Sequence, residues 1–221
     1  QLHSYESFTP EDYVLVQQIA RDFSSVMGTK LGINTWFYYY PEKNLVISEG
    51  SIYNAELYFS KYRSYSNLQQ KTIDSMIDTP SRLLLNLDTQ NSWSLTGKTI
   101  NQDVVPFVTS YYSLIRQRAL MVVNIQTSDI YNQTLQYQTS DQMGLLIADS
   151  EGHTIASWGI LQGAEISHEI LSNMEQGEYC LTEQSLNGSS VVFLSSKCTF
   201  PNWNIHVAYN KSEFYQKSNM L

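Results

Sequence analysis

The side chains in this sequence that could carry out covalent or metal chemistry lack the spacing that such chemistry needs. Its four histidines form no HxxxH pair and its two cysteines form no CxxC pair, so no metal-binding motif is present. We find no GxSxG nucleophile elbow, and no GxGxxG or GxxxxGKS/T phosphate loop. Glu11 and Asp12 stand at the start of an expected helix, where carboxylates offset the helix dipole. The sequence therefore favours a protein with no catalytic residues, no cofactor and no metal site.

The two cysteines, Cys180 and Cys198, are a disulfide candidate. They flank Asn187-Gly188, which is the strongest hairpin turn signal in the chain. A hairpin closed by this dipeptide places Cys180 opposite about Ser195, so a bulge or a wider loop is needed to bring Cys198 alongside. A disulfide requires Cα atoms within about 7 Å of each other. The sequence leaves two possibilities open: a bridge, which would indicate an oxidising compartment, or two separate thiols.

A continuous aromatic strand, with residues 36–40 reading WFYYY, is the feature most suggestive of binding. Because side chains alternate along a strand, aromatic rings line both of its faces. One face must meet the core, while the other is free to wall a cavity beneath a helical insert. We expect Tyr38 and four further residues around the same sheet to contact a small molecule: Arg82, Trp93, Tyr111 and Asn124. For each of them, ordinary packing or surface polarity is the alternative.

Composition limits the class of partner. The 221 residues are 42 % apolar, which is enough for two compact units of about 100 residues each. No window approaches about 18 consecutive apolar residues, so no segment is expected to span a membrane. The net charge is -8, with 13 Lys and Arg against 21 Asp and Glu and no basic cluster. Such a chain repels phosphate backbones, and we expect no nucleic-acid binding.

An amphipathic helix is expected near the N-terminus. Thr9 is a suitable N-cap, Pro10 suits the first helical position, and acidic residues follow in the first turn. Apolar residues then recur at helical spacing as far as Met27, and Gly28 is a plausible stop. The sequence therefore predicts a helix of about 18 residues, which has no counterpart of equal length before the second unit.

The rest of the chain contains the same plan twice. Strands Ile33–Tyr40 and Leu45–Ser48 form one expected hairpin, and strands Met143–Asp149 and His153–Trp158 form another about 110 residues later. Each hairpin leads into a helical stretch and then three more β-prone segments. We therefore predict an α+β protein with two PAS-like modules, each an antiparallel five-stranded sheet of order 2-1-5-4-3 with helices. The expected boundaries are 1–30 for the N-terminal helix, 31–127 for the first module, 128–140 for a connector, and 141–221 for the second module and C-terminal tail.

The order and spacing of these segments resemble the extracellular double Cache (dCache) sensor domains of bacterial transmembrane receptors. The segments that carry the resemblance cover nearly all of the chain: Thr9–Met27, Thr35–Gly50, Tyr53–Tyr62, Arg118–Leu135, Leu145–Ser157 and Asn202–Tyr215. The resemblance implies an extracellular, non-enzymatic part of a histidine kinase or AraC-type regulator in the cell membrane. It also implies transmembrane helices before residue 1 and after residue 221, and a small-molecule ligand in the first, membrane-distal module.

The resemblance is less specific about the ligand. Amino-acid-binding members carry an Arg-x-Trp-Tyr run entering the third strand and an Asp in the fifth strand. Arg82 lies in the right region without such a run, Trp93 falls near the third-strand aromatic position, and Asn124 stands where the amine-binding Asp would be. Because an Asn lacks the charge that an ammonium group prefers, a neutral or carboxylate-bearing molecule fits at least as well as an amino acid. Arg82 or Arg63 would then pair with an anionic group.

Two other classes of function remain open. The chain could be an interaction module that binds a protein or only dimerises, with the N-terminal helix as the surface of a homodimer. It could also be a secreted enzyme, for which the sequence offers no catalytic residues.

Overall fold

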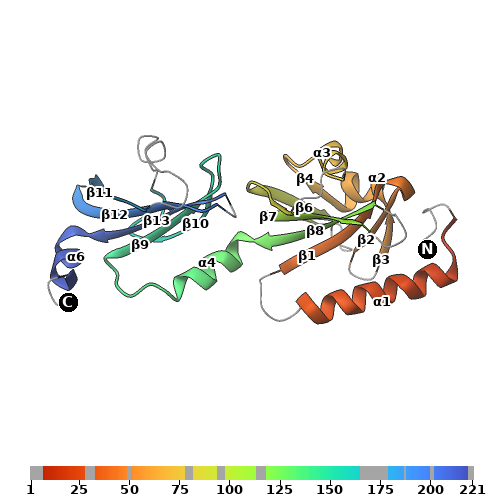
Figure 1. Cartoon of the computed structure of the whole chain (residues 1–221), viewed down its shortest axis with the longest axis horizontal. Coiled ribbons are helices and arrows are strands. Elements are labelled where there is room, and N and C mark those ends of the chain that lie inside the picture. Colours follow the sequence, from red (N-terminus) through yellow and green to blue (C-terminus); the bar gives the residue numbers. More distant parts are fainter. Residues whose placement is uncertain are drawn as a thin grey trace. The chain divides into compact units, whose positions relative to one another are not determined.

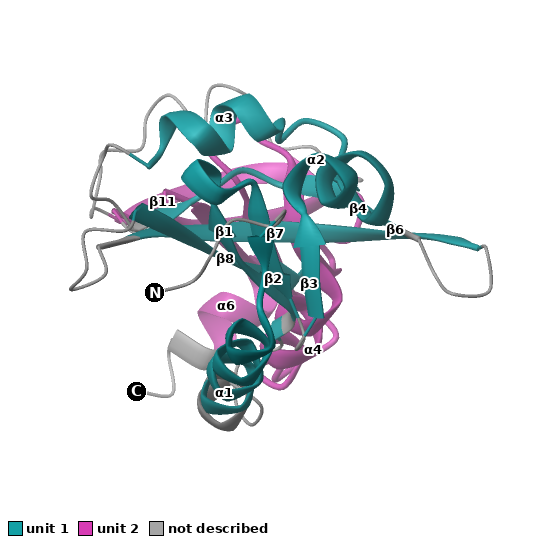
Figure 2. Cartoon of the chain, turned by 90° about the vertical axis from the view of Figure 1, so that its right-hand side faces the viewer, with its two compact units in different colours: residues 1–126 teal, residues 127–221 magenta. Residues whose placement is uncertain are grey.

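The computed structural model describes residues 7–27, 33–48, 51–77, 82–93, 98–112, 118–164, 179–186, 188–199 and 202–218. These residues divide into two compact units, 1–126 and 127–221, which are coloured separately in Figure 2. Each unit is built on one antiparallel sheet, so the chain is an α+β protein with an N-terminal helix and two antiparallel sheets (Figure 1). Within the described residues, no helix has the length and apolarity needed to cross a membrane.

The first sheet contains eight strands in the order β3-β2-β1-β8-β7-β6-β4, with β5 paired to β7. Its strands are β1 (Ile33–Tyr40), β2 (Leu45–Ser48), β3 (Ser51–Asn54), β4 (Arg63–Tyr65), β5 (Arg82–Leu84), β6 (Asp88–Trp93), β7 (Thr99–Tyr112) and β8 (Arg118–Gln126). Five of them, β2-β1-β8-β7-β6, have the expected order 2-1-5-4-3. The prediction of only five strands is wrong for this unit, because β3, β4 and β5 add to the sheet. Each added strand has three or four residues, too few to show a strand period in the sequence.

The second sheet has the order β10-β9-β13-β12-β11, which is the predicted 2-1-5-4-3. Its strands are β9 (Met143–Ala148), β10 (Thr154–Gly159), β11 (Tyr179–Leu186), β12 (Ser189–Lys197) and β13 (Asn204–Asn210). The turn between β9 and β10 uses Gly152 at φ 90°, a conformation that glycine adopts without a steric penalty. Asp149 stabilises the same turn, since its Oδ1 accepts hydrogen bonds from the backbone N–H groups of Glu151 and His153. The helical stretch expected after the second hairpin, at Glu165–Met174, lies outside the described residues.

Helix α1 (Pro10–Met27) begins as the sequence predicts. Thr9 N donates to Asp12 Oδ2 at 2.8 Å, and Asp12 N donates to Thr9 Oγ1 at 3.4 Å, which is a reciprocal capping box. The helix buries Val16 and Ala20 against the first sheet. The other described helices are η2 (Pro41–Lys43), α2 (Ala55–Leu57), the π-helix η3 (Tyr58–Tyr62), α3 (Gln70–Ser75), α4 (Thr127–Leu135) and α6 (Lys211–Ser218).

Both faces of the aromatic strand β1 are covered. Trp36 and Tyr38 lie on the α1 side, where Trp36 packs with Ala20 of α1. Phe37 and Tyr39 lie on the opposite side, in a core cluster beneath α2, η3 and α3. Figures 1 and 2 show α1 on one side of this sheet and the α2 and α3 segment on the other. The side of β1 expected to wall an open cavity is therefore largely core, and any cavity must lie further out among the helices.

Cys180 and Cys198 are free thiols, which is the second of the two possibilities that the sequence left open. The β11–β12 register pairs Cys180 with Ser195, as the Asn187-Gly188 turn predicts. Cys198 lies three residues beyond Ser195, roughly 10 Å along the strand. That separation exceeds the reach of about 7 Å that a disulfide allows.

Candidate functional site

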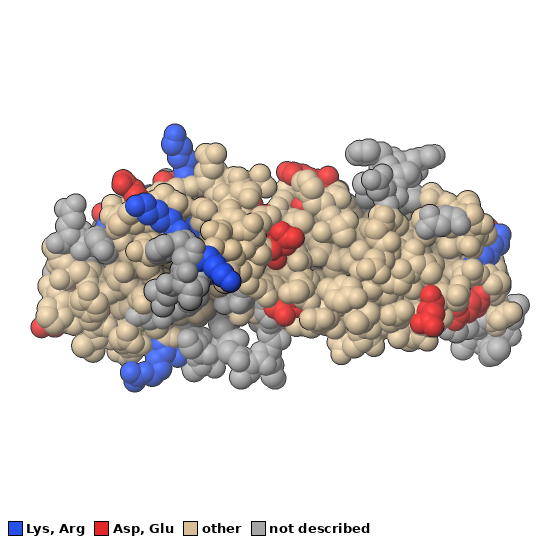
Figure 3. Space-filling view, turned by 180° about the vertical axis from the view of Figure 1, so that it is seen from behind, with Lys and Arg blue, Asp and Glu red and all other residues tan. Residues whose placement is uncertain are grey.

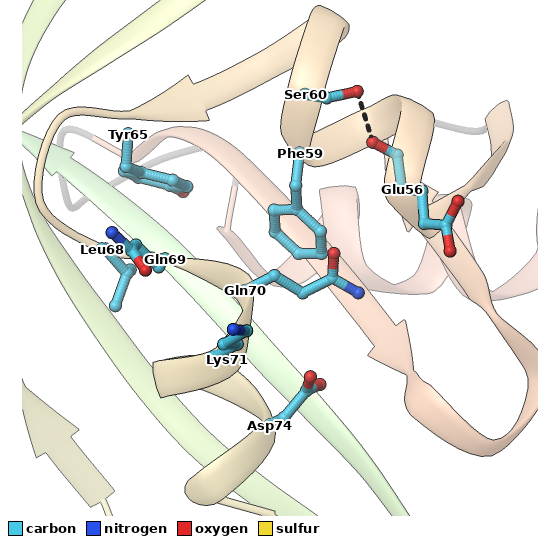
Figure 4. A pocket seen from close by; sticks show the side chains of 9 residues that line it. All are labelled: Glu56, Phe59, Ser60, Tyr65, Leu68, Gln69, Gln70, Lys71 and Asp74. Carbon is cyan, nitrogen blue, oxygen red and sulfur yellow. Dashed lines mark hydrogen bonds between the residues drawn. The ribbon is translucent and has the colours of Figure 1, made fainter.

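A pocket of about 620 Å³ opens in the first unit, on the side of the sheet opposite α1. Its lining comes from one continuous stretch of chain that runs from α2 through η3 and β4 to α3. The lining residues, drawn in Figure 4, are Glu56, Phe59, Ser60, Tyr65, Leu68, Gln69, Gln70, Lys71 and Asp74. Figure 4 shows Tyr65 and Leu68 at one end of the pocket and Glu56 at the other. This volume is within the range of about 300–1,000 Å³ that is typical of small-molecule sites.

Aromatic packing attaches the wall of the pocket to the sheet. The fully buried ring of Tyr58 lies 5.2 Å from that of Phe37, and the ring of Phe59 lies 5.6 Å from Phe37 and 5.3 Å from Tyr39. Asn54 caps α2, because its Oδ1 accepts a hydrogen bond from Leu57 N. Phe59 is thus held in the pocket by a π-helix, a form found frequently at functional sites.

The loop that leads into α3 is held by a buried carboxylate. Asp88 Oδ2 accepts a 2.7 Å hydrogen bond from Leu68 N, and Asp88 Oδ1 accepts one of 3.0 Å from Asn67 N. In α3 itself, Ile73 is fully buried in the core cluster beneath the insert. Gln70, Lys71 and Asp74 of this helix therefore reach the pocket from a firmly anchored backbone.

Asp74 is oriented by the sheet. Tyr39 donates a 2.7 Å hydrogen bond from its hydroxyl to Asp74 Oδ1, and Gln70 Nε2 donates to the same hydroxyl at 3.0 Å. Burial and the bond to Asp74 raise the pKa of the Tyr39 phenol well above its ordinary value, so it stays a neutral donor. Glu56 and Lys71 are exposed at the pocket and have no ion-pair partner among the described residues. The pocket thus offers two carboxylates, one ammonium group and aromatic walls.

Behind Tyr65, four neutral side chains form a closed hydrogen-bonded ring. Its members, from four strands of the first sheet, are Thr35 of β1, Tyr65 of β4, Gln90 of β6 and Asn124 of β8. Thr35, Gln90 and Asn124 are all buried. Burial raises the pKa of the Tyr65 phenol, which keeps this ring uncharged at neutral pH.

Of the predicted site residues whose side chains are described, Asn124 contacts a residue that lines the pocket and Tyr38 lies away from it. Asn124 is buried under the pocket and contacts Tyr65, which lines it. Tyr38 packs on the α1 side of the sheet, with its ring 5.8 Å from that of Trp36. Tyr38 does not line this pocket, because the strand alternation that buries Tyr39 under the insert turns Tyr38 to the other face.

The strand register separates the other predicted residues. Trp93 pairs with Thr99 at the start of β7, whereas Tyr111 lies on β7 twelve residues further along. At roughly 3.3 Å per residue, this is roughly 40 Å of strand, so Trp93 and Tyr111 do not belong to one small-molecule site. Arg82 pairs with Thr109, near the Tyr111 end. The side chains of Arg82, Trp93 and Tyr111 lie outside the described part of the structure.

The sequence prediction missed the residues that line the pocket. It placed a cavity beneath the helical insert but assigned contacts only to the sheet, and none of the nine lining residues was named. One signal was available in the insert. Gln70 and Asp74 are four residues apart, a spacing that puts both polar side chains on one face wherever the insert is helical.

The second unit has a smaller cavity of about 190 Å³, lined by Gln142, Ile160, Leu186, Ser189, Val191 and Asn210. Its core also contains a buried polar pair, in which Ser195 Oγ and His206 Nδ1 are 2.8 Å apart. Burial lowers the pKa of His206 to about 4, so this histidine is neutral at physiological pH. No group of three or more metal-ligating side chains occurs in the described ranges. On the face drawn in Figure 3, most of the described surface is uncharged.

The sequence matches no protein-family model and no curated protein. Solved structures do resemble the chain. One is the ligand-binding domain of the Campylobacter jejuni chemoreceptor Tlp3 in complex with 4-methylisoleucine, with a TM-score of 0.58 and 14 % sequence identity. The alignment covers 95 % of this chain and 77 % of the Tlp3 chain. Another is the extracellular domain of a candidate histidine kinase, mmHK1S-Z3, with a TM-score of 0.61 and 10 % sequence identity. The alignment covers 98 % of this chain and 86 % of the kinase-domain chain.

A second extracellular domain, from the candidate histidine kinase rpHK1S-Z16, has a TM-score of 0.52 at 11 % identity and covers 92 % of this chain and 87 % of its own. At such low identity, these likenesses concern the fold. They agree with the N-terminal helix and the two sheets described above. The chain therefore has the double Cache fold of the extracellular sensor domains of bacterial chemoreceptors and histidine kinases.

Proposed function

We propose that this chain is the extracellular sensing part of a transmembrane signal-transduction receptor, which binds a small metabolite in the first unit and acts without catalysis. The observation that supports this proposal is the 620 Å³ pocket on the insert side of the first sheet. The larger pocket, with charged and aromatic lining, is in the first unit, whereas the cavity described in the second unit is about 190 Å³.

The lining of the pocket suits a small polar molecule. The carboxylates of Asp74 and Glu56 suit a hydrogen-bond donor or an ammonium group, and Lys71 suits a carboxylate. Phe59 and Tyr65 provide apolar surface for a hydrocarbon part. We therefore propose an amino-acid-like, carboxylate-bearing or neutral polar metabolite. The isoleucine complex of Tlp3 makes branched amino acids reasonable members of a test panel.

Transmission to the membrane would pass through the second unit. In α6, Lys211 forms an ion pair with Glu183 of β11, and Tyr215 donates a 2.7 Å hydrogen bond to Glu183. Ser140, in the loop before β9, donates to Glu213 of the same helix at 2.8 Å. These contacts couple α6 to the second sheet, so a change in that sheet would shift the population of α6 arrangements.

Thermal unfolding in the presence of a metabolite panel tests the proposal. A ligand at 100 times its Kd should stabilise the protein by about 2.7 kcal/mol and raise Tm accordingly. Lys71→Ala should reduce the shift caused by a carboxylate-bearing compound of the panel. Lys61→Ala is the matched control, because Lys61 is also exposed but does not line the pocket. Failure of every compound to raise Tm, or an equal shift in both variants, would contradict the proposal.

A second candidate function is a dimerisation module, favoured by the surface of α1. Tyr13, Val14 and Leu15 are exposed on this helix, with Val14 at 70 %. A surface of this kind suits a second copy of the chain. Sedimentation velocity over a range of concentrations would detect a dimer. Val14→Glu should then abolish it, while Gln133→Glu, at an exposed position of α4 and outside the surface of α1, should leave it intact.

A further inference from the structure

The ring behind the pocket is closed and runs in one direction. Thr35 Oγ1 donates to Gln90 Oε1 at 3.3 Å, and Gln90 Nε2 donates to the Tyr65 hydroxyl at 3.1 Å. The Tyr65 hydroxyl donates to Asn124 Oδ1 at 3.0 Å, and Asn124 Nδ2 donates to Thr35 Oγ1 at 2.8 Å. Each member therefore gives one hydrogen bond and accepts another. Such cooperative networks are rigid when they are complete and costly when one member is lost.

The ring also joins strands that are not neighbours. Thr35 and Asn124 are a cross-strand pair of β1 and β8, and Tyr65 and Gln90 are a pair of β4 and β6. In the order of the sheet, β1 and β6 are three places apart, yet their side chains Thr35 and Gln90 meet. The position of the Tyr65 hydroxyl is thus set by contacts from strands on both sides of β7.

Only one member of the ring reaches the pocket. Gln90 and Asn124 have no exposed surface, and Thr35 is 4 % exposed, whereas Tyr65 lines the cavity. A ligand that bound Asn124 directly would have to displace Tyr65 and break the ring. Because breaking the ring leaves buried amide groups without hydrogen-bond partners, that arrangement is disfavoured.

We propose that Thr35, Gln90 and Asn124 are positioning residues that act through Tyr65. They hold the phenol ring of Tyr65 as a fixed wall of the pocket. Because the Tyr65 hydroxyl is already hydrogen-bonded to Gln90 and Asn124, it is not available to bind an occupant. An occupant then meets the ring of Tyr65 at this end of the pocket, while its charged groups lie toward Glu56, Lys71 and Asp74. The relevance to ligand selection rests on the proposed function, but the positioning itself is a property of the free protein.

Proton NMR of the ligand-free protein with labelled tyrosine tests the positioning. The Tyr65 signals are those that are present in the spectrum of the wild type and absent from the spectrum of Tyr65→Phe. In the wild type we expect a slowly exchanging Tyr65 hydroxyl proton. Thr35→Val removes the Thr35 hydroxyl, which is hydrogen-bonded to Gln90 and Asn124 and not to Tyr65, and should abolish that slow exchange. Thr35→Ser restores a hydroxyl and should restore the signal.

Tyr39 is the internal control. Its hydroxyl is held by Asp74 and Gln70, a network separate from the ring, so its signals should be the same in wild type and Thr35→Val. An unchanged Tyr65 hydroxyl in a Thr35→Val protein that keeps its Tyr39 signals would overturn the proposal. If that variant does not fold, Gln90→Met makes the same test from β6, and retention of slow exchange there would overturn it equally. Since no metabolite is added, a failed ligand panel leaves this result unaffected.

Discussion

The hydroxyl of Tyr39 and the carboxylate of Asp74 join the first sheet to the pocket through a 2.7 Å hydrogen bond. Tyr39 lies in the interior strand β1, and Asp74 lies on α3, which has only six residues. A helix this short is marginal on its own, so it depends on such tertiary contacts. The bond therefore contributes both to the stability of the insert and to the orientation of a carboxylate that lines the pocket.

Tyr39→Phe should lower the free energy of unfolding by about 1.5–3 kcal/mol, because the hydrogen bond is made to a charged group. It should also leave Asp74 free to rotate out of the pocket. Urea denaturation followed by circular dichroism measures the stability. Tyr137→Phe, at an exposed tyrosine, should change it by less than about 0.5 kcal/mol. Equal stabilities for the two variants would contradict the role of this bond.

Asn124→Asp tests the neutrality of the ring. A carboxylate at this fully buried position can accept from Tyr65 and Thr35 but cannot donate to Thr35 while ionised. Burial should raise the pKa of the new carboxyl in the folded state above its unfolded value. The folded state then binds more protons, so the variant should lose stability as the pH rises from about 4 toward 7.

Urea denaturation of Asn124→Asp and wild type at several pH values measures this difference. The control is Asn91→Asp, on β6 of the same sheet, at a partly buried position outside the ring. The prediction would be contradicted if the difference in free energy of unfolding between wild type and Asn124→Asp did not grow from pH 5 to pH 7.

His206 should make the second unit sensitive to acid. Its pKa is lowered by burial to about 4, from an ordinary value of 6.5. Between these two values the unfolded chain binds a proton that the folded protein does not, so stability falls as the pH drops from about 6.5 to about 4. At about 1.4 kcal/mol per pKa unit, the loss is about 3 kcal/mol.

The measurement is the free energy of unfolding as a function of pH for wild type and His206→Gln. The variant has no group that titrates at this position, so the difference between the two curves should shrink or change sign as the pH falls. Parallel curves over this window would show that His206 does not carry the effect.

Gly159 should be intolerant of a side chain. It has φ 63°, and a Cβ added there would lie 2.0 Å from the carbonyl oxygen of Met143. Gly152 has φ 90°, but nothing lies within 4 Å of its added Cβ. Both Gly→Ala changes carry the cost of a left-handed backbone, about 1–2 kcal/mol. Gly159→Ala should be more destabilising by a further 1–3 kcal/mol or so, because the backbone must move.

Thermal unfolding of the two variants side by side checks this prediction. A Tm for Gly159→Ala equal to that of Gly152→Ala would show that the β9–β10 ladder adjusts without cost.

Local patterns were sufficient for much of the fold. The capping box at Thr9 and Asp12, the turn at Gly152 and the Asn187-Gly188 hairpin all depend on residues close together in the chain. From such signals the order 2-1-5-4-3 was predicted, and it is confirmed for the whole second sheet. The strands β3, β4 and β5 were missed, because three or four residues show no period and pair only where the sheet offers a partner.

The sequence by itself determined the α+β class and the two antiparallel repeats, since hydrophobic period and turn chemistry act over a few residues. The pocket of the first unit is lined by residues of the insert and not by β1 as the sequence suggested. Only the tertiary structure decided which side chains face that cavity. Register turned Tyr38 away from it and placed Trp93 and Tyr111 far apart. Folding also brought Thr35, Tyr65, Gln90 and Asn124 into one ring. These four residues are separated by 25 to 89 positions along the chain. Hydrogen bonds over such separations produce no periodic pattern that a single sequence could show.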